Sequence, residues 1–218
     1  MSAALRAPAH GPLEIRGHPR HSTLVRITHW LSAFSFLGLL VSGVAILLAH
    51  PRLYWGETGA VGAPSLIDLP LPFVLEGQSG WGRSLHFLLS WVLVGTGGLY
   101  VAAGVATRHF KRDLLPGTRN SDEPGIYSLL QRLAYLAIIF LVSPLIIWTG
   151  LAQSPAITSV VPALVGALGG QQSARTVHFC AAGLLVLFFV VHVTMVSRAG
   201  FGDRMWAMIA GGAGGRRT

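Results

Sequence analysis

The chain has 218 residues, of which 52% are hydrophobic and only 11% are charged, and its net charge is +8. An ordinary soluble domain carries about 25% charged residues, so this composition argues against a water-soluble fold, and its hydrophobicity argues against disorder. The basic residues lie between long apolar runs rather than on one face, which indicates membrane topology signals and no nucleic-acid partner. The one cysteine, Cys180, excludes an internal disulfide framework and a Cys-cluster metal site.

Four apolar runs follow one another along the chain, at residues 27–49, 85–106, 128–152 and 176–197. Each holds about 22–25 residues, or roughly 33–37 Å of helix, which is enough for a hydrocarbon core about 30 Å thick. A backbone inside a bilayer must satisfy its own hydrogen bonds, so each run is predicted to be a helix. The first run is too long for the core of a cleaved signal peptide. The predicted fold is an all-α, integral membrane four-helix bundle.

The basic residues predict the orientation of these helices. Twelve of them fall in the N-terminal tail, the second loop and the C-terminal tail: Arg6, Arg16, Arg20, Arg26, Arg108, Lys111, Arg112, Arg119, Arg198, Arg204, Arg216 and Arg217. The first and third loops carry only Arg52, Arg83 and Arg175. Both termini are therefore expected in the cytoplasm.

This organisation divides the chain into a cytoplasmic tail at 1–25, a transmembrane domain at 26–198 and a Gly- and Arg-rich cytoplasmic tail at 199–218. The first outer loop, 51–84, is long for a connector and carries several aromatic residues, so it is either a docking surface for another protein or part of an interfacial aromatic belt. No internal repeat is apparent.

Four histidines lie within or at the edges of these runs: His29 near the start of the first, His86 near the start of the second, and His178 and His192 in the fourth. At about 100° per residue, the 14-residue step from His178 to His192 is about 40° short of four turns, so both face one way, roughly 21 Å apart. Helix direction places His86 at the depth of His178, and His29 at the depth of His192. The sequence therefore offers two histidine pairs at two depths.

Two imidazoles from facing helices suit the two axial positions of a haem iron, which then carries electrons rather than activating a substrate. The chain has no C-x-x-C-H motif for covalent attachment. Structural zinc needs four ligands in one place, and a proton relay usually includes Asp or Glu, which these runs lack. A single membrane histidine can also serve only to hydrogen-bond helices together.

Arg26, Arg83 and Arg175 each precede one of these histidines by three residues. They are candidates to bind haem propionates, because arginine grips carboxylates in bidentate fashion, or they are simply topology signals that snorkel to the interface. Gly43 lies 14 residues after His29 and can either admit a porphyrin or allow close helix packing. Pro144 is expected to kink or strain the third helix.

Together, the segment Arg26-Ile27-Thr28-His29-Trp30, the histidine of the second helix and the pair 14 residues apart on the fourth resemble the bacterial cytochrome b561 and nickel-hydrogenase cytochrome b family. The resemblance spans residues 23–198 and implies a protein of the bacterial inner membrane. It implies two haem b groups, with His86 and His178 on the outer iron and His29 and His192 on the inner one.

Members of that family carry electrons between a partner enzyme, usually periplasmic, and membrane quinone. The long first loop is similar to that of members paired with a periplasmic molybdopterin oxidoreductase. A hydrogenase is the other type of partner that the resemblance implies. The resemblance also leaves open a stand-alone quinone oxidoreductase with a diffusible donor, and a structural anchor without haem remains a further alternative. No catalytic site of the chain's own is evident.

A quinone site is expected near the inner haem, where Gln131, Arg132 and His109 are polar candidates or ordinary interfacial residues. His50, at the outer end of the first helix, is an interfacial residue or a contact for a propionate or partner. The remaining histidines, His10, His18 and His21, are expected in a solvated tail.

Overall fold

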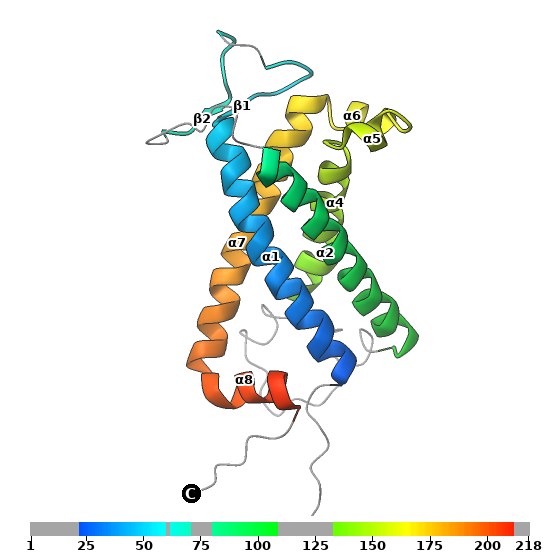
Figure 1. Cartoon of the computed structure of the whole chain (residues 1–218), viewed down its shortest axis with the longest axis vertical. Coiled ribbons are helices and arrows are strands. Elements are labelled where there is room, and N and C mark those ends of the chain that lie inside the picture. The colour runs from blue at the N-terminus through cyan, green and yellow to red at the C-terminus, as the bar shows by residue number, and fades with distance from the viewer. Residues whose placement is uncertain (1–21, 60–61, 71–79, 109–132, 212–218) are drawn as a thin grey trace, which may run out of the picture.

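The computed structural model describes residues 22–59, 62–70, 80–108 and 133–211. Within them, four helical spans are long and apolar enough to cross a membrane: α1 (Thr23–Ala49), α2 (Gly80–Ala106), Leu133–Leu151, and α7 (Gln171–Arg198). The prediction of an all-α, four-helix membrane protein is confirmed (Figure 1). Helices α1, α2 and α7 begin four or five residues before the apolar runs, because polar residues complete their first turns. At α1, for example, the Ser22 side chain accepts a hydrogen bond from the amide of Val25.

The third span contains a widened turn. Residues 133–137 are helical, a π-helical turn η2 covers Ile138–Val142, and α4 covers Ser143–Leu151. Pro144 lacks an amide hydrogen, and its ring would clash with the carbonyl of Phe140 in a regular helix. The π turn avoids that clash, and both the amide and the hydroxyl of Ser143 bond to the carbonyl of Ile138. The expected irregularity at Pro144 is therefore a wider turn of helix.

The spans pack as two pairs, α1 along α2 and α4 along α7. Small residues bring α1 and α2 together: a Cβ atom on Gly82 would lie 3.3 Å from the Cβ of Ala45. Ser32 and Thr96 also share a hydrogen bond of 3.1 Å across the same interface. The two pairs meet where Phe36 of α1 contacts Phe189 of α7, with ring centroids 5.3 Å apart.

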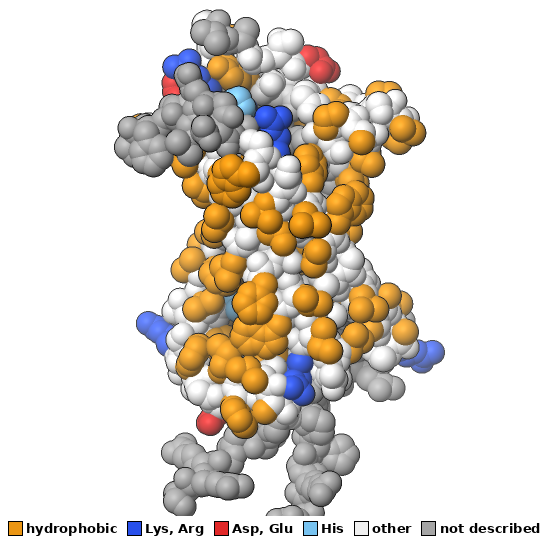
Figure 2. Space-filling model, viewed as in Figure 1, with side chains coloured by type: hydrophobic (Ala, Val, Ile, Leu, Met, Phe, Trp, Pro, Cys, Tyr) orange, Lys and Arg blue, Asp and Glu red, His pale blue; other side chains and the backbone are white. Residues whose placement is uncertain are grey.

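The outer surface of these helices is apolar. Side chains such as Phe34, Leu141 and Leu187 are 60% exposed or more. Figure 2 shows hydrophobic side chains over the middle of one face, with the charged side chains near its two ends. This distribution is typical of a protein whose middle section lies in the hydrocarbon core of a membrane.

The two ends of the bundle differ. One end, the loop end, carries the short antiparallel strands β1 (Arg52–Leu53) and β2 (Ile67–Asp68) and the short helices α5 (Pro155–Thr158) and α6 (Ala163–Gly166). The other end, the α8 end, holds the start of α1 and the helix α8 (Phe201–Ala210), which runs across the bundle in Figure 1. The sequence pattern did not predict α8, which lies between Gly200 and Gly211, both at positive φ.

The close approach of α1 and α2 predicts a difference between two glycine substitutions. Gly82→Val places branched methyl groups against Ala45 and the carbonyl of Ser42, so we expect it to lower stability by about 1–3 kcal/mol. Gly95→Val is the matched control on the same helix, where a Cβ atom meets nothing within 4 Å. Thermal unfolding in detergent measures both; equal melting temperatures would contradict this packing.

Candidate functional site

His86 of α2 and His178 of α7 come together at the loop end, with ring centroids 6.2 Å apart. Imidazole nitrogen binds a first-row metal at about 2.0–2.1 Å, and it lies about 1.1 Å from its ring centre, so two imidazoles on opposite sides of one ion have centroids about 6.3 Å apart. The observed separation of the centroids is close to this value.

Ser42 of α1 forms a hydrogen bond with the Nδ1 atom of His86. Its Oγ lies 3.0 Å from His86 Nδ1, and it also lies 2.8 Å from the carbonyl oxygen of Gly38. A hydroxyl has one hydrogen, and when that hydrogen goes to the carbonyl, the oxygen accepts from Nδ1–H. In this arrangement the other ring nitrogen, Nε2, carries the lone pair that a metal needs.

Thr149 of α4 holds His178 in the same way. Its Oγ1 lies 2.9 Å from His178 Nδ1 and 2.8 Å from the carbonyl oxygen of Leu145. Both hydroxyl-bearing residues are fully buried, at 0% exposure. Each imidazole of the pair therefore rests on a hydroxyl of the neighbouring helix.

The two halves of this site share short motifs that the sequence analysis missed. Ser42-Gly43-Val44-Ala45 on α1 corresponds to Thr149-Gly150-Leu151-Ala152, and both alanines are buried. Arg83-Ser84-Leu85-His86-Phe87 on α2 likewise corresponds to Arg175-Thr176-Val177-His178-Phe179 on α7. A Cβ on Gly43 would lie 3.6 Å from His86 Cε1, and one on Gly150 would lie 3.4 Å from His178 Cε1.

The loop after β1 closes over the start of α7. The carbonyl of Gly56 accepts from the amides of Gln172 and Ser173, which are among the free amides of the first helical turn. Ser173 Oγ accepts from the amide of Gly56 at 2.8 Å, and Thr176 Oγ1 donates to the carbonyl of Tyr54 at 2.7 Å. These bonds fix the first turns of α7, and with them the position of His178.

Positive charge gathers beside this pair. Arg175 donates to the carbonyl of His50, at the C-terminal end of α1. Burial lowers the pKa of His50 below its ordinary value, and the charges of Arg175 and Arg83 lower that pKa further. The positive charges of Arg83 on α2 and Arg175 on α7 therefore both affect His50 at the loop end.

At the α8 end, His192 of α7 contacts two aromatic side chains. Its ring stacks on Phe188 with centroids 5.9 Å apart, and its Nδ1 lies 3.3 Å from the hydroxyl of Tyr135. Tyr135 precedes Thr149 by 14 residues, as His178 precedes His192, so two hydroxyls on the third span pair with two imidazoles on α7. That shared spacing was a signal available in the sequence.

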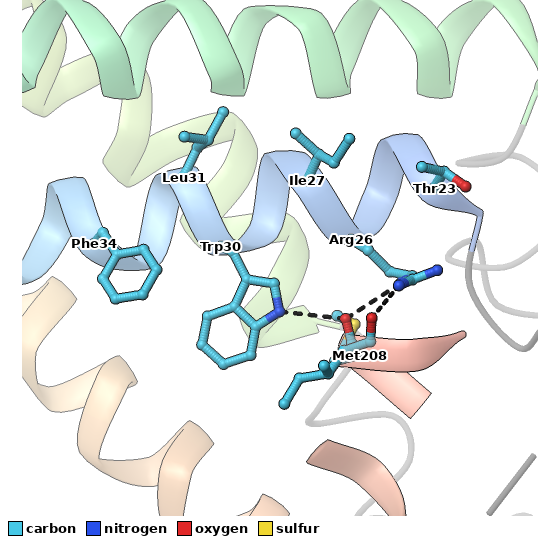
Figure 3. A pocket seen from close by; sticks show the side chains of 8 residues that line it. Thr23, Arg26, Ile27, Trp30, Leu31, Phe34 and Met208 are labelled. Carbon is cyan, nitrogen blue, oxygen red and sulfur yellow. Dashed lines mark hydrogen bonds between the residues drawn. The ribbon is translucent and has the colours of Figure 1, made fainter. Parts of the chain in front are cut away.

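His29 lies in the second turn of α1, with its ring edge-on to Trp30 at 5.5 Å between centroids. Figure 3 shows Arg26 and Trp30 pointing to the end of α8. Trp30 Nε1 donates to the carbonyl of Met208 at 3.2 Å, and Arg26 donates to the carbonyls of Met208 and Ile209. These residues line an open cavity of about 370 Å³. Arg26 thus binds the negative end of the α8 dipole.

Several candidates from the sequence lie outside the described residues: His10, His18, His21, His109, Gln131 and Arg132. Among the residues that the structure describes, no group of three or more His, Cys, Asp or Glu side chains is placed to hold a metal ion. The loop-end site therefore offers a metal two protein ligands.

Comparison with known proteins identifies the family of this membrane protein. The model of the family described as prokaryotic cytochrome b561 matches residues 20–211. The chain belongs to this family. A curated relative from Azospira oryzae, named putative protein-methionine-sulfoxide reductase subunit YedZ1, is 29% identical over 197 residues, which is 81% of this chain and 89% of the relative. No solved structure matches the chain.

The expected family resemblance is thus confirmed, and the cytochrome is a membrane haem b electron-transfer subunit. The loop-end residues fit this group. A porphyrin supplies four ligands to its iron, so the protein needs to add only two, a number that the imidazoles of His86 and His178 could supply. The buried hydroxyls behind the rings supply the outer hydrogen bonds that metal-binding histidines make.

Arg26 gives a prediction that separates two roles. Arg26→Ala removes the donors that hold Met208 and Ile209, so we expect faster amide hydrogen exchange in α8 with no loss of haem. Arg198→Ala removes another cation at the end of α7 and is the control. Loss of haem with unchanged exchange in α8 would instead assign Arg26 to a propionate.

Proposed function

We propose that the cytochrome holds two haem b groups in series across the membrane, His86 and His178 binding the iron at the loop end and His29 and His192 binding the iron at the α8 end. The observation that carries this proposal is the His86–His178 pair, whose centroids lie 6.2 Å apart. When bound, haem b supplies reversible one-electron Fe(III)/Fe(II) chemistry. The chain supplies ligands, spacing and exclusion of water.

Helix geometry supports the second pair. Phe36 follows His29 by seven residues, about two turns, and therefore lies on the same face of α1. Phe189 precedes His192 by three residues on α7, and the two phenylalanines are in contact. Measured from the contact between Phe36 and Phe189, both His29 and His192 therefore lie on the side of the α8 end.

The arginines at the loop end support the placement of haem propionates there. Arg83 and Arg175 both act on His50, and a positive field favours carboxylates at this depth. Arg26, the third candidate from the sequence, donates to carbonyls at the end of α8 instead.

We further propose that the loop end faces the periplasm and the α8 end the cytoplasm of a bacterium, as the arginine distribution favours. The partner at the loop end is then a periplasmic oxidoreductase of the molybdopterin type, and membrane quinone reacts at the α8 end. The name of the Azospira oryzae relative, a subunit of a putative protein-methionine-sulfoxide reductase, favours a reductase as that partner. A stand-alone quinone oxidoreductase with a diffusible donor is the alternative that the absence of a bound partner would favour.

Substitution of the ligands tests the haem assignment. We expect His86→Ala and His178→Ala each to remove one haem, and His29→Ala and His192→Ala each to remove the other, because an iron that loses an axial imidazole is held weakly. Reduced-minus-oxidised visible spectra and the haem-to-protein ratio measure this. His50→Ala, outside both pairs, is the control and retains both haems. Unchanged haem content in all four ligand variants would refute the assignment.

The path across the membrane is tested with the partner present. Extraction from native membranes in mild detergent is expected to co-purify an oxidoreductase whose oxidised pterin is fluorescent. A quinol analogue is then expected to reduce the remaining haem of the His86→Ala variant without reducing the partner, because the loop-end step is missing. Reduction of the partner at the wild-type rate by that variant would contradict a path through His86.

A further inference from the structure

The strongest further observation is the pair of buried hydroxyls behind the loop-end imidazoles. We propose that Ser42 and Thr149 are positioning residues that hold the Nδ1–H groups of His86 and His178, fix the ring orientation, and set the potential of the haem between them. This inference rests on the proposed function, because it takes the two histidines as axial ligands.

The direction of the hydrogen bond follows from the neighbouring acceptors. The hydroxyl oxygens of Ser42 and Thr149 lie 3.1–3.2 Å from the carbonyl oxygens of Leu39 and Ile146, which stand three residues before each of them. A carbonyl oxygen only accepts, so the single hydrogen of each hydroxyl goes to a carbonyl, and the hydroxyl oxygen accepts from Nδ1–H of the imidazole. The lone pair of each ring is then on Nε2, where an axial ligand needs it.

Burial makes this arrangement persistent. Ser42 and Thr149 are inaccessible to solvent, and no bulk water competes for Nδ1–H inside a membrane span. An N–H left without an acceptor there costs free energy, so the ring has one favoured rotation. Glycine follows each hydroxyl residue and leaves room against Cε1 of the ring, at Gly43 and Gly150.

The same feature recurs on two different helix pairs. Ser42 belongs to α1 and serves a histidine of α2, while Thr149 belongs to α4 and serves a histidine of α7. Each hydroxyl bonds back to the carbonyl four residues before it, Gly38 and Leu145 respectively. Accidental polar packing does not account for two sites that match in residue order, burial and distance.

The chemical consequence concerns the haem potential. Donation from Nδ1–H to an oxygen makes the imidazole a more basic ligand, and such outer contacts typically change metal affinity by 10–100-fold. A more basic ligand stabilises Fe(III) over Fe(II). Removal of the hydroxyl therefore raises the midpoint potential of the loop-end haem, by about 59 mV for a tenfold change in the one-electron equilibrium.

The test is a redox titration of the full-length, haem-loaded protein, followed by its visible spectrum. His86→Ala first identifies the loop-end haem as the one that is lost. We expect Thr149→Val and Ser42→Ala each to raise the midpoint potential of that haem by about 59 mV, which is a tenfold change in the one-electron equilibrium constant. The potential of the other haem is expected to stay unchanged. Thr149→Ser keeps the hydroxyl and is expected to restore the wild-type potential. Ser35→Ala, a buried serine two turns earlier on α1, is the matched control.

The outcomes separate the two proposals. Selective loss of the loop-end haem in Thr149→Val or Ser42→Ala, rescued in Thr149→Ser, also supports the positioning role. Unchanged potentials in both variants overturn the positioning role, because the hydroxyls then have no effect on the axial histidines. Loss of both haems in both variants also overturns it, because the hydroxyls then contribute only to general packing. Retention of both haems in His86→Ala overturns the ligand assignment itself.

Discussion

An imidazole inside a membrane must direct both of its nitrogens to partners, and this requirement organises the loop end of the cytochrome. His86 and His178 face each other across 6.2 Å, and a buried hydroxyl on a neighbouring helix meets the Nδ1 of each. The helices that carry the hydroxyls, α1 and α4, belong to different packed pairs. Each hydrogen bond lies within one pair, α1 with α2 or α4 with α7, and the two pairs meet at this depth through the contact between the two imidazoles.

The surroundings of this site supply rigidity. The loop at Tyr54–Gly56 binds the first turns of α7, and Arg175 binds the last carbonyl of α1. Helix ends are the weakest parts of a helix, because their backbone groups lack partners within it. Satisfying them at the loop end keeps His178 of α7 at a fixed depth, as its proposed role as a haem ligand requires.

The sequence predicted the spans, and it also drew attention to the histidines, because an ionisable side chain within a long apolar run is conspicuous at any register. It placed the helix starts four or five residues late, since polar first turns resemble loops. It missed Ser42 and Thr149, because hydroxyl residues are common in membrane helices and only packing reveals which of them meets an imidazole. It also missed α8, a ten-residue helix between glycines whose position depends on Arg26 and Trp30.

The two ends of the bundle differ in chemistry as well as in depth. At the loop end, both imidazoles rest on aliphatic hydroxyls whose oxygens also bond to backbone carbonyls. At the α8 end, His192 meets the phenol of Tyr135 and the face of Phe188, while His29 lies edge-on to Trp30. A phenol oxygen is a poorer acceptor than an aliphatic hydroxyl, so an imidazole whose Nδ1–H donates to it keeps less electron density than one whose Nδ1–H donates to serine or threonine. On the proposed assignment of two haems, their potentials are therefore unequal, and the lower one lies at the loop end. The hydrogen-bond partner of each imidazole, rather than any change of fold along the path, would then distinguish the two haems.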